Sequence, residues 1–284
     1  GSTRPTSMTS IRPVRELRPG VWHWHAPHPA WSADEPWEQN VSSYAIDDGE
    51  RLLLFDPIAP PGELEELAAG RSIAVVLTNP WHDRDTRSLV DRLGTPVHAP
   101  RPESAQDLMD KYGITAEQAG DGSPDLRWLL TGEAGEAHWY SPDEGAPAGI
   151  QAFAGREPQD LVLWIEQHRT VICGDSLVDF GQGLEIPQQW LRPAVTREHI
   201  VASLSPLLDL PVELVLPTHG APTDRAALDA DVATIHAVAP LTAAVAFELH
   251  AERDVDLLGV LGHGVGLEGV ENEAFEEFLR RGAS

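Results

Sequence analysis

The chain is short of several residue types, and each shortage excludes a class of structure or partner. It has a single cysteine, Cys173, so a disulfide within the chain and a zinc cluster built on several cysteines are both excluded. This cysteine use is typical of a reducing compartment, and we expect a cytoplasmic protein. No apolar run reaches the roughly 18 residues that a membrane-spanning helix needs.

Basic residues are scarce as well. The sequence has 20 Lys and Arg against 45 Asp and Glu, which gives a formal net charge of −25. Nucleic-acid binding depends on clustered Lys and Arg that neutralise phosphates, so we expect no nucleic-acid partner. Anionic membrane surfaces attract basic segments for the same reason, so we expect no membrane partner.

Apolar residues are plentiful enough for a large core. The 284 residues are 42% hydrophobic, which suits a folded chain with one large domain. We expect a disordered N-terminal tail over residues 1–17, of which 1–7 look like a cloning remnant. We expect the main domain over residues 18–240 and a helical C-terminal extension over residues 241–284.

Strand and helix patterns occur in clusters along the chain. Residues 73–77, with the sequence IAVVL, form a continuous apolar run, as expected for a strand buried on both faces. Such clusters favour an α/β fold with two sheets between helical layers. We expect strands over 21–25, 41–46, 51–55, 73–77, 96–98, 126–130, 137–140, 149–153, 161–166, 170–173 and 212–216, and helices over 62–69, 85–93, 196–208, 223–238, 241–250 and 272–281.

Three polar stretches follow predicted strands, where loops can gather polar groups on a rigid frame. They are LTNPWHDRD at 77–85, CGDS at 173–176 and LPTHG at 216–220, and LLLFDP at 52–57 precedes them with Asp56. In this order they resemble the metallo-β-lactamase superfamily, whose motifs are T-H-x-H-x-D-H, G-H, G-D and H-G. The resemblance implies a four-layer αββα sandwich and, in typical members, a dinuclear zinc or iron hydrolase.

The ligand positions of that superfamily are only partly kept. We align Thr78 with the threonine of the first motif. The first metal site of the superfamily then has none of its histidines in this chain. The second metal site keeps its two acidic ligands and its last histidine. We therefore expect no bound metal. If one divalent ion such as Zn, Fe or Mn is bound, Asp83, Asp175 and His219 are the expected ligands, with His82 as a further candidate. At the ligand positions of the superfamily motifs, this chain has Asn79, Trp81, Asp83, Arg84, Asp175 and His219. The histidine of the G-H motif would fall near Ala146.

Arg84 stands at a position where the superfamily has a histidine. Two carboxylates about 4 Å apart repel by roughly 4 kcal/mol at an effective dielectric of 20, and a guanidinium can offset this repulsion. Our hypothesis is that Arg84 pairs with Asp83, Asp175 or both, where a metal would otherwise stand. The cleft residues are then His82, Asp83, Arg84, Asp175 and His219.

Two functions remain open. The first is a degenerate metallo-β-lactamase-fold protein without dinuclear zinc hydrolase activity, whose residual cleft binds a small molecule. The alternative is a hydrolase of an ester, thioester or lactone that uses a single metal or a histidine acid/base, His82 or His219.

The segment 22–37 is rich in aromatic residues. It suggests a third function, that of a structural or regulatory subunit that pairs through this segment. His23 and His25 would share one face of a strand, which allows two metal ligands but also suits an aromatic strand of the outer sheet. The tryptophans of this segment are suited to a pocket wall or to a homodimer interface. They are Trp22, Trp24, Trp31 and Trp37.

Overall fold

The computed structural model describes residues 14–120 and 125–233. The helices predicted at 241–250 and 272–281, and with them the C-terminal extension, lie outside the described residues. No helix of the described part is long and apolar enough to cross a bilayer.

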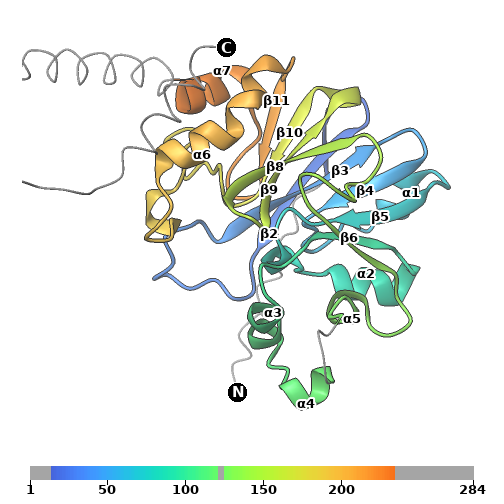
Figure 1. The fold of residues 1–284 in the computed structure, drawn as a ribbon. Helices are drawn as coiled ribbons and strands as arrows, with labels where there is room; N and C mark the ends of the chain where they lie inside the picture. The colour runs from blue at the N-terminus through green and yellow to red at the C-terminus, as the bar shows by residue number, and fades with distance from the viewer. Residues whose placement is uncertain (1–13, 121–124, 234–284) are drawn as a thin grey trace, which may run out of the picture. The chain divides into compact units, whose positions relative to one another are not determined.

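The larger sheet in the described residues has seven strands that follow one another in chain order (Figure 1). The strands from β1 to β4 pair antiparallel, and those from β4 to β7 pair parallel. Parallel pairing requires a crossover, which α1 (Leu64–Ala68) and α2 (Thr86–Leu93) provide. The strands are β1 (Arg15–Arg18), β2 (Val21–Pro27), β3 (Asn40–Asp47), β4 (Arg51–Phe55), β5 (Ser72–Val76), β6 (Val97–Pro100) and β7 (Ala137–Tyr140).

The smaller sheet has five strands in the order β12-β11-β10-β9-β8. Its parallel pair is β10 with β11, and its other pairs are antiparallel. The carboxyl ends of β10 and β11 therefore lie side by side, which places the loops that follow them next to each other. The strands are β8 (Ile150–Glu157), β9 (Asp160–Ile165), β10 (Thr170–Cys173), β11 (Leu214–Pro217) and β12 (Thr223–Asp224).

Apolar side chains hold the two sheets face to face. Phe55 of β4, Leu163 of β9 and Ile172 of β10 belong to one buried cluster. Leu54 of β4 points to the opposite face, where it packs with Leu64 of α1 and Leu89 of α2. Successive residues of β4 thus fill two different apolar layers, which is why the strand is apolar throughout.

Helices cover the outer face of the smaller sheet in the same way. Trp164 of β9 packs in a third cluster with Ile200 of α6 and Leu228 of α7. The three clusters separate four layers, so the predicted αββα sandwich is confirmed (Figure 1). The remaining helical segments are α3 (Ala105–Tyr112), α4 (Ala116–Ala119), α5 (Trp128–Thr131), α6 (Arg197–Leu204), α7 (Arg225–Leu228), the 3₁₀ turns η1 (Pro80–His82), η2 (Glu166–His168), η3 (Gln188–Trp190) and η4 (Ser205–Asp209), and the π turn η5 (Asp229–Ala233).

Three local predictions are wrong. The helix predicted over 223–238 begins two residues late, because Thr223 and Asp224 pair with β11 as strand β12. The strand predicted over 126–130 is instead the start of the helical turn α5, because Leu126 and Leu129, three residues apart, pack on one side into the cluster with Leu108 of α3. The tail predicted over 1–17 ends earlier, because Arg15 and Glu16 already pair with β2 in the larger sheet.

Candidate functional site

The candidate site lies where the loops after β5, β10 and β11 meet. After β5 the chain enters η1, whose first turn is capped by Asn79: its side-chain oxygen accepts a hydrogen bond from the backbone N–H of Trp81 at 3.0 Å. His82 is the last residue of this turn and is buried. Asp175 follows β10 by two residues, and His219 follows β11 by two residues.

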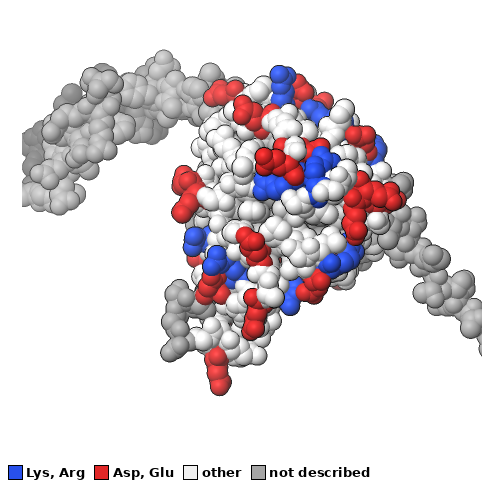
Figure 2. Space-filling model, turned by 90° about the vertical axis from the view of Figure 1, so that its right-hand side faces the viewer, with Lys and Arg blue, Asp and Glu red and all other residues white. Residues whose placement is uncertain are grey.

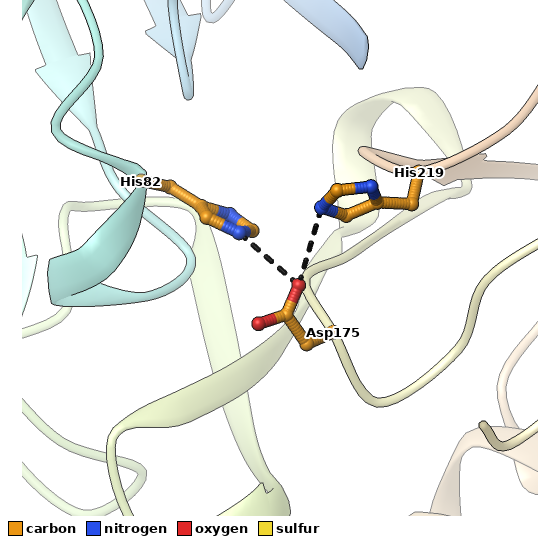
Figure 3. Close-up of side chains that lie close together, drawn as sticks. All are labelled: His82, Asp175 and His219. Atoms are coloured by element: carbon orange, nitrogen blue, oxygen red, sulfur yellow. Dashed lines mark ion pairs between the residues drawn. The ribbon is translucent and has the colours of Figure 1, made fainter. Parts of the chain in front are cut away.

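These loops bring His82, Asp175 and His219 together (Figure 3). The Nε2 atom of His82 lies 3.1 Å from Oδ1 of Asp175, and Nε2 of His219 lies 3.5 Å from the same oxygen. This oxygen is buried and has no hydrogen-bond partner among the described residues. One donor atom from each residue falls within 4.8 Å of the others. The donor set therefore fits one divalent metal, since imidazole and carboxylate are its usual ligands.

A second carboxylate fixes the orientation of His82. Oδ2 of Asp56 lies 2.9 Å from Nδ1 of His82, so the opposite ring nitrogen faces Asp175. Asp56 is fully buried and also accepts hydrogen bonds from the backbone N–H and the hydroxyl of Thr78, at 2.8 and 2.5 Å. Metal-bound histidines commonly have such a carboxylate on the other ring nitrogen.

Arg156 of β8 is the arginine that pairs with Asp175. Its Nη2 donates to Oδ2 of Asp175 at 2.8 Å, and its Nε lies 3.3 Å from Oδ2 of Asp160. Asp160 in turn accepts the backbone N–H of Asp175 at 2.9 Å. Burial and the nearby Asp175 carboxylate raise the pKa of Asp160 to about 7. The sequence analysis did not find Arg156, because it lies beyond the strand predicted over 149–153 and no motif marks it.

The predicted ion pair of Arg84 with Asp83 or Asp175 is wrong. Nη1 of Arg84 donates instead to the backbone oxygens of Ser42 and Asp56, both at 2.7 Å. Asp83 faces away from the cleft, where it pairs with Lys111 and accepts the hydroxyl of Tyr112 at 2.5 Å. The turn η1 causes this difference, because it points His82 into the cleft and leaves the next residue on the other side.

His82 therefore replaces Asp83 in the expected set of metal ligands. Trp81, at a superfamily histidine position, packs against the apolar cluster of α3 and α5. Asn79, at the other position, donates weakly to Oδ2 of Asp175 at 3.4 Å. In the part of the chain that the structure describes, His82, Asp175 and His219 are the one group of three potential ligands.

When no metal is bound, the two histidines of the site differ in their protonation. Burial opposes protonation of His82, but the carboxylates of Asp175 and Asp56 outweigh it and raise the pKa of His82 to about 9. Burial lowers the pKa of His219 to about 3, helped by the charges of His82 and Arg84 and opposed by Asp175. His82 is thus charged and His219 neutral at neutral pH.

A cavity of about 410 Å³ opens onto these residues. Two tryptophans flank His219 edge to face, Trp37 at 5.2 Å and Trp190 at 5.3 Å between ring centres. Trp37 thus forms part of the pocket wall, whereas Trp24 is buried in the core and donates its Nε1–H to the backbone oxygen of Ile58. The lining residues are His28, Trp37, His82, Arg84, Arg156, Asp175, Trp190 and His219.

The other sequence candidates lie outside this cavity. Nε2 of His23 lies 2.9 Å from the hydroxyl of Ser42, and its ring stacks on Tyr44. His23 and His25 line a separate cavity of about 660 Å³. Cys173 is fully buried, and burial raises the pKa of its thiol far above the ordinary range, so the thiol is inert.

Comparison with known proteins places this architecture. The chain is a mixed α/β protein with two facing sheets. Several solved structures share this fold. It is similar to VMB-1, with a TM-score of 0.52 and 15% identity over 82% of this chain and 100% of that one. It is similar to the DIM-1 metallo-β-lactamase, with a TM-score of 0.52 and 12% identity over 78% and 95%. It is also similar to a metallo-β-lactamase from Pontibacter korlensis, with a TM-score of 0.50 and 16% identity over 79% and 98%.

The chain therefore has the metallo-β-lactamase fold. No protein-family model matches the chain, and no curated protein matches its sequence.

Proposed function

We propose that this protein is a hydrolase with one divalent metal position, formed by His82, Asp175 and His219. Its substrates are small molecules with an ester, thioester or lactone carbonyl. The observation that carries the proposal is the approach of two imidazole Nε2 atoms, at 3.1 and 3.5 Å, to one buried carboxylate oxygen without a hydrogen-bond partner.

The surrounding residues suit this role. When bound, a divalent metal would polarise a carbonyl oxygen and lower the pKa of a bound water. Asp56 holds the His82 ring with its Nε2 toward the site. Arg156 binds Oδ2 of Asp175 and leaves Oδ1 facing the two histidines. The cavity of about 410 Å³ has the size of a small-molecule site.

A second metal position is not supported by the residues present. Two of the superfamily's histidine positions hold Asn79 and Trp81, and Trp81 packs into an apolar cluster. Arg84 and Arg156 add two permanent positive charges to the lining of the cavity. A second dication would be repelled by both guanidinium groups, so we expect one metal per chain.

Metal analysis of protein purified without chelator tests this proposal. We expect about one equivalent of zinc, iron or manganese in the wild type, and its loss in Asp175→Ala and His219→Ala. Asp83→Asn is the matched control, because Asp83 faces Lys111 and should leave the metal content unchanged. Two equivalents of metal, or loss of metal in Asp83→Asn, would overturn the proposal.

A specific observation also favours a metal-free cleft. Asp56, His82, Asp175 and Arg156 form a chain of alternating negative and positive charges, linked by contacts of 2.9, 3.1 and 2.8 Å. Such a chain stabilises itself without an ion, and the protein would then bind a small molecule without hydrolysing it. The same metal analysis distinguishes the two: under the metal-free alternative, added zinc or manganese is not retained and no ester or lactone of a broad panel is turned over.

A further inference from the structure

Arg84 is a cation on the wall of the cleft whose protein partners are neutral. Its Nη1 donates to two backbone carbonyls, and its Nε is buried without a hydrogen-bond partner. Among the described residues, no carboxylate lies within 4.0 Å of this guanidinium to form an ion pair. Arg156, on the same cavity, approaches the carboxylates of Glu157, Asp160 and Asp175.

The guanidinium thus has no direct ion pair among the described residues, and the carboxylates of Asp56, Asp175 and Asp83 act on it from longer range. It keeps its proton at any ordinary pH, so it cannot lower its cost by becoming neutral. Charged groups taken out of water are normally paired, because an unpaired charge is costly to desolvate. The cavity beside Arg84 is therefore a favourable place for an anion that a ligand brings with it.

The backbone holds Arg84 in place at a conformational cost. Its φ of 40° lies in the left-handed region, which is strained for a residue with a β-carbon. The preceding residue, Asp83, is fixed on the opposite side by Lys111 and Tyr112. Backbone strain of this kind persists where the surroundings enforce it, often at ligand sites. The guanidinium is thus presented to the cavity in one orientation.

Aromatic rings form the adjacent wall. His28 and Trp37 are in edge-to-face contact at 5.3 Å, and Trp37, His219 and Trp190 continue the row at 5.2 and 5.3 Å. Phe180 extends it, at 5.3 Å from Trp190. Such a row suits a flat or apolar group.

We propose that the cleft binds small monocarboxylates that carry an aromatic or apolar group, with the carboxylate on Arg84 and the apolar group against Trp37 and Trp190. Because Nη1 is bonded to two backbone carbonyls and Nε is buried, Nη2 is the nitrogen left to donate to the carboxylate. A polyanion would need more cations, and Arg156 is already engaged by its own carboxylates. The proposal rests on the proposed function only in that the cavity is the ligand site, and it does not require the metal.

Isothermal titration calorimetry with two probes of the same shape tests the proposal. Phenylacetate carries the carboxylate, and phenylacetamide is its neutral counterpart. We expect wild-type protein to bind phenylacetate at least 10-fold more tightly than phenylacetamide. Arg84→Gln should remove this preference. Arg84→Lys should keep part of it, because lysine retains the positive charge but not the planar guanidinium group. The exposed Arg87 of α2 gives the control, and Arg87→Gln should bind both probes like the wild type.

Metal content is measured on the same samples, so that the two proposals fail separately. Equal affinity of wild-type protein for both probes, no binding of phenylacetate, or an undiminished preference in Arg84→Gln would each overturn the carboxylate proposal, whatever the metal content. Wild-type protein without metal that still prefers phenylacetate would overturn the metal position and support carboxylate recognition. The comparison of the two probes on wild-type protein needs no variant, so the test holds even if Arg84→Gln does not fold.

Discussion

Asp56 determines how His82 faces the site, and it does so from a fully buried position. It accepts three hydrogen bonds, two from Thr78 and one contact of 2.9 Å with Nδ1 of His82. The direction of the His82 ring therefore depends on a residue that does not itself reach the cleft.

We predict that Asp56→Asn destabilises the protein by about 2–3 kcal/mol, because the amide places a donor against donors in a buried site. The metal affinity should fall about 10- to 100-fold, as for other groups that orient a metal-bound histidine. Urea denaturation and metal titration measure the two effects. Asp91→Asn, at a surface position of α2, is the control and should change neither. Unchanged metal affinity in a folded Asp56→Asn protein would contradict this role.

At the level of single residues, the sequence predicted which loops carry the site residues better than it predicted which way each side chain points. Asp175 and His219 follow strands, and the parallel pairing of β10 with β11 brings their loops together. Whether His82 or Asp83 enters the cleft depends on the turn η1, and the motif spacing does not show that this turn forms. Arg156 reaches Asp175 across the chain from another strand, and no local pattern indicates such a contact.

Among the secondary-structure elements, α3 is the one that fixes the loop carrying His82. Lys111, the only lysine of the chain, pairs with Asp83 and donates to the backbone oxygen of Pro80 at 3.0 Å. Its ammonium group also lies 5.5 Å from the ring centre of Trp81. Residues 80–83 are thus held from outside by one helix.

Lys111→Met tests this contact and keeps most of the apolar side-chain volume. We expect a loss of stability of about 1–2 kcal/mol, because Asp83 loses a charged partner in a partly buried place. We expect metal binding to change little, because Asp56 still orients the His82 ring. Thermal unfolding and metal titration provide the readouts. Arg87→Met is the matched control: it breaks an exposed pair with Asp91 and should change stability by less than about 0.5 kcal/mol.

Elements with continuous apolar runs could be predicted closely from sequence. The strands β4, β7 and β10 have the bounds expected for them. The turn α5 could not be recognised, because its four residues are too few to show a helical period. Short irregular turns also form the site, so the fold could be predicted further than the geometry of the cleft.

In the whole molecule, charge is distributed in small groups of both signs on the face that Figure 2 shows. The acidic excess of the sequence, a formal net charge of −25, does not extend into the cleft, which Arg84 and Arg156 line. Histidines away from the cleft are the groups that link stability to pH near neutrality. Two of them are partly buried in the larger sheet, His23 on β2 and His98 on β6.

Burial lowers the pKa of His98 to about 4, helped by the nearby charges of His138 and Arg51. In the unfolded chain a histidine has a pKa of about 6.5, so between pH 6.5 and 4 the unfolded state binds a proton that the folded state does not. The contribution of His98 to stability is therefore complete above pH 6.5 and is lost as the pH falls toward 4.

His98→Gln should make the decline of the unfolding free energy between pH 6.5 and 4.5 less steep than in the wild type, by at most about 1.4 kcal/mol per pH unit. Urea denaturation at several pH values measures this slope. His199→Gln, at an exposed position of α6, serves as the control and should leave the slope as it is. A wild-type slope in His98→Gln would show that other groups cause the acid sensitivity. Because His98 stacks on His138 of the adjacent parallel strand at 5.0 Å, the charge of His138 adds to the resistance of His98 to protonation.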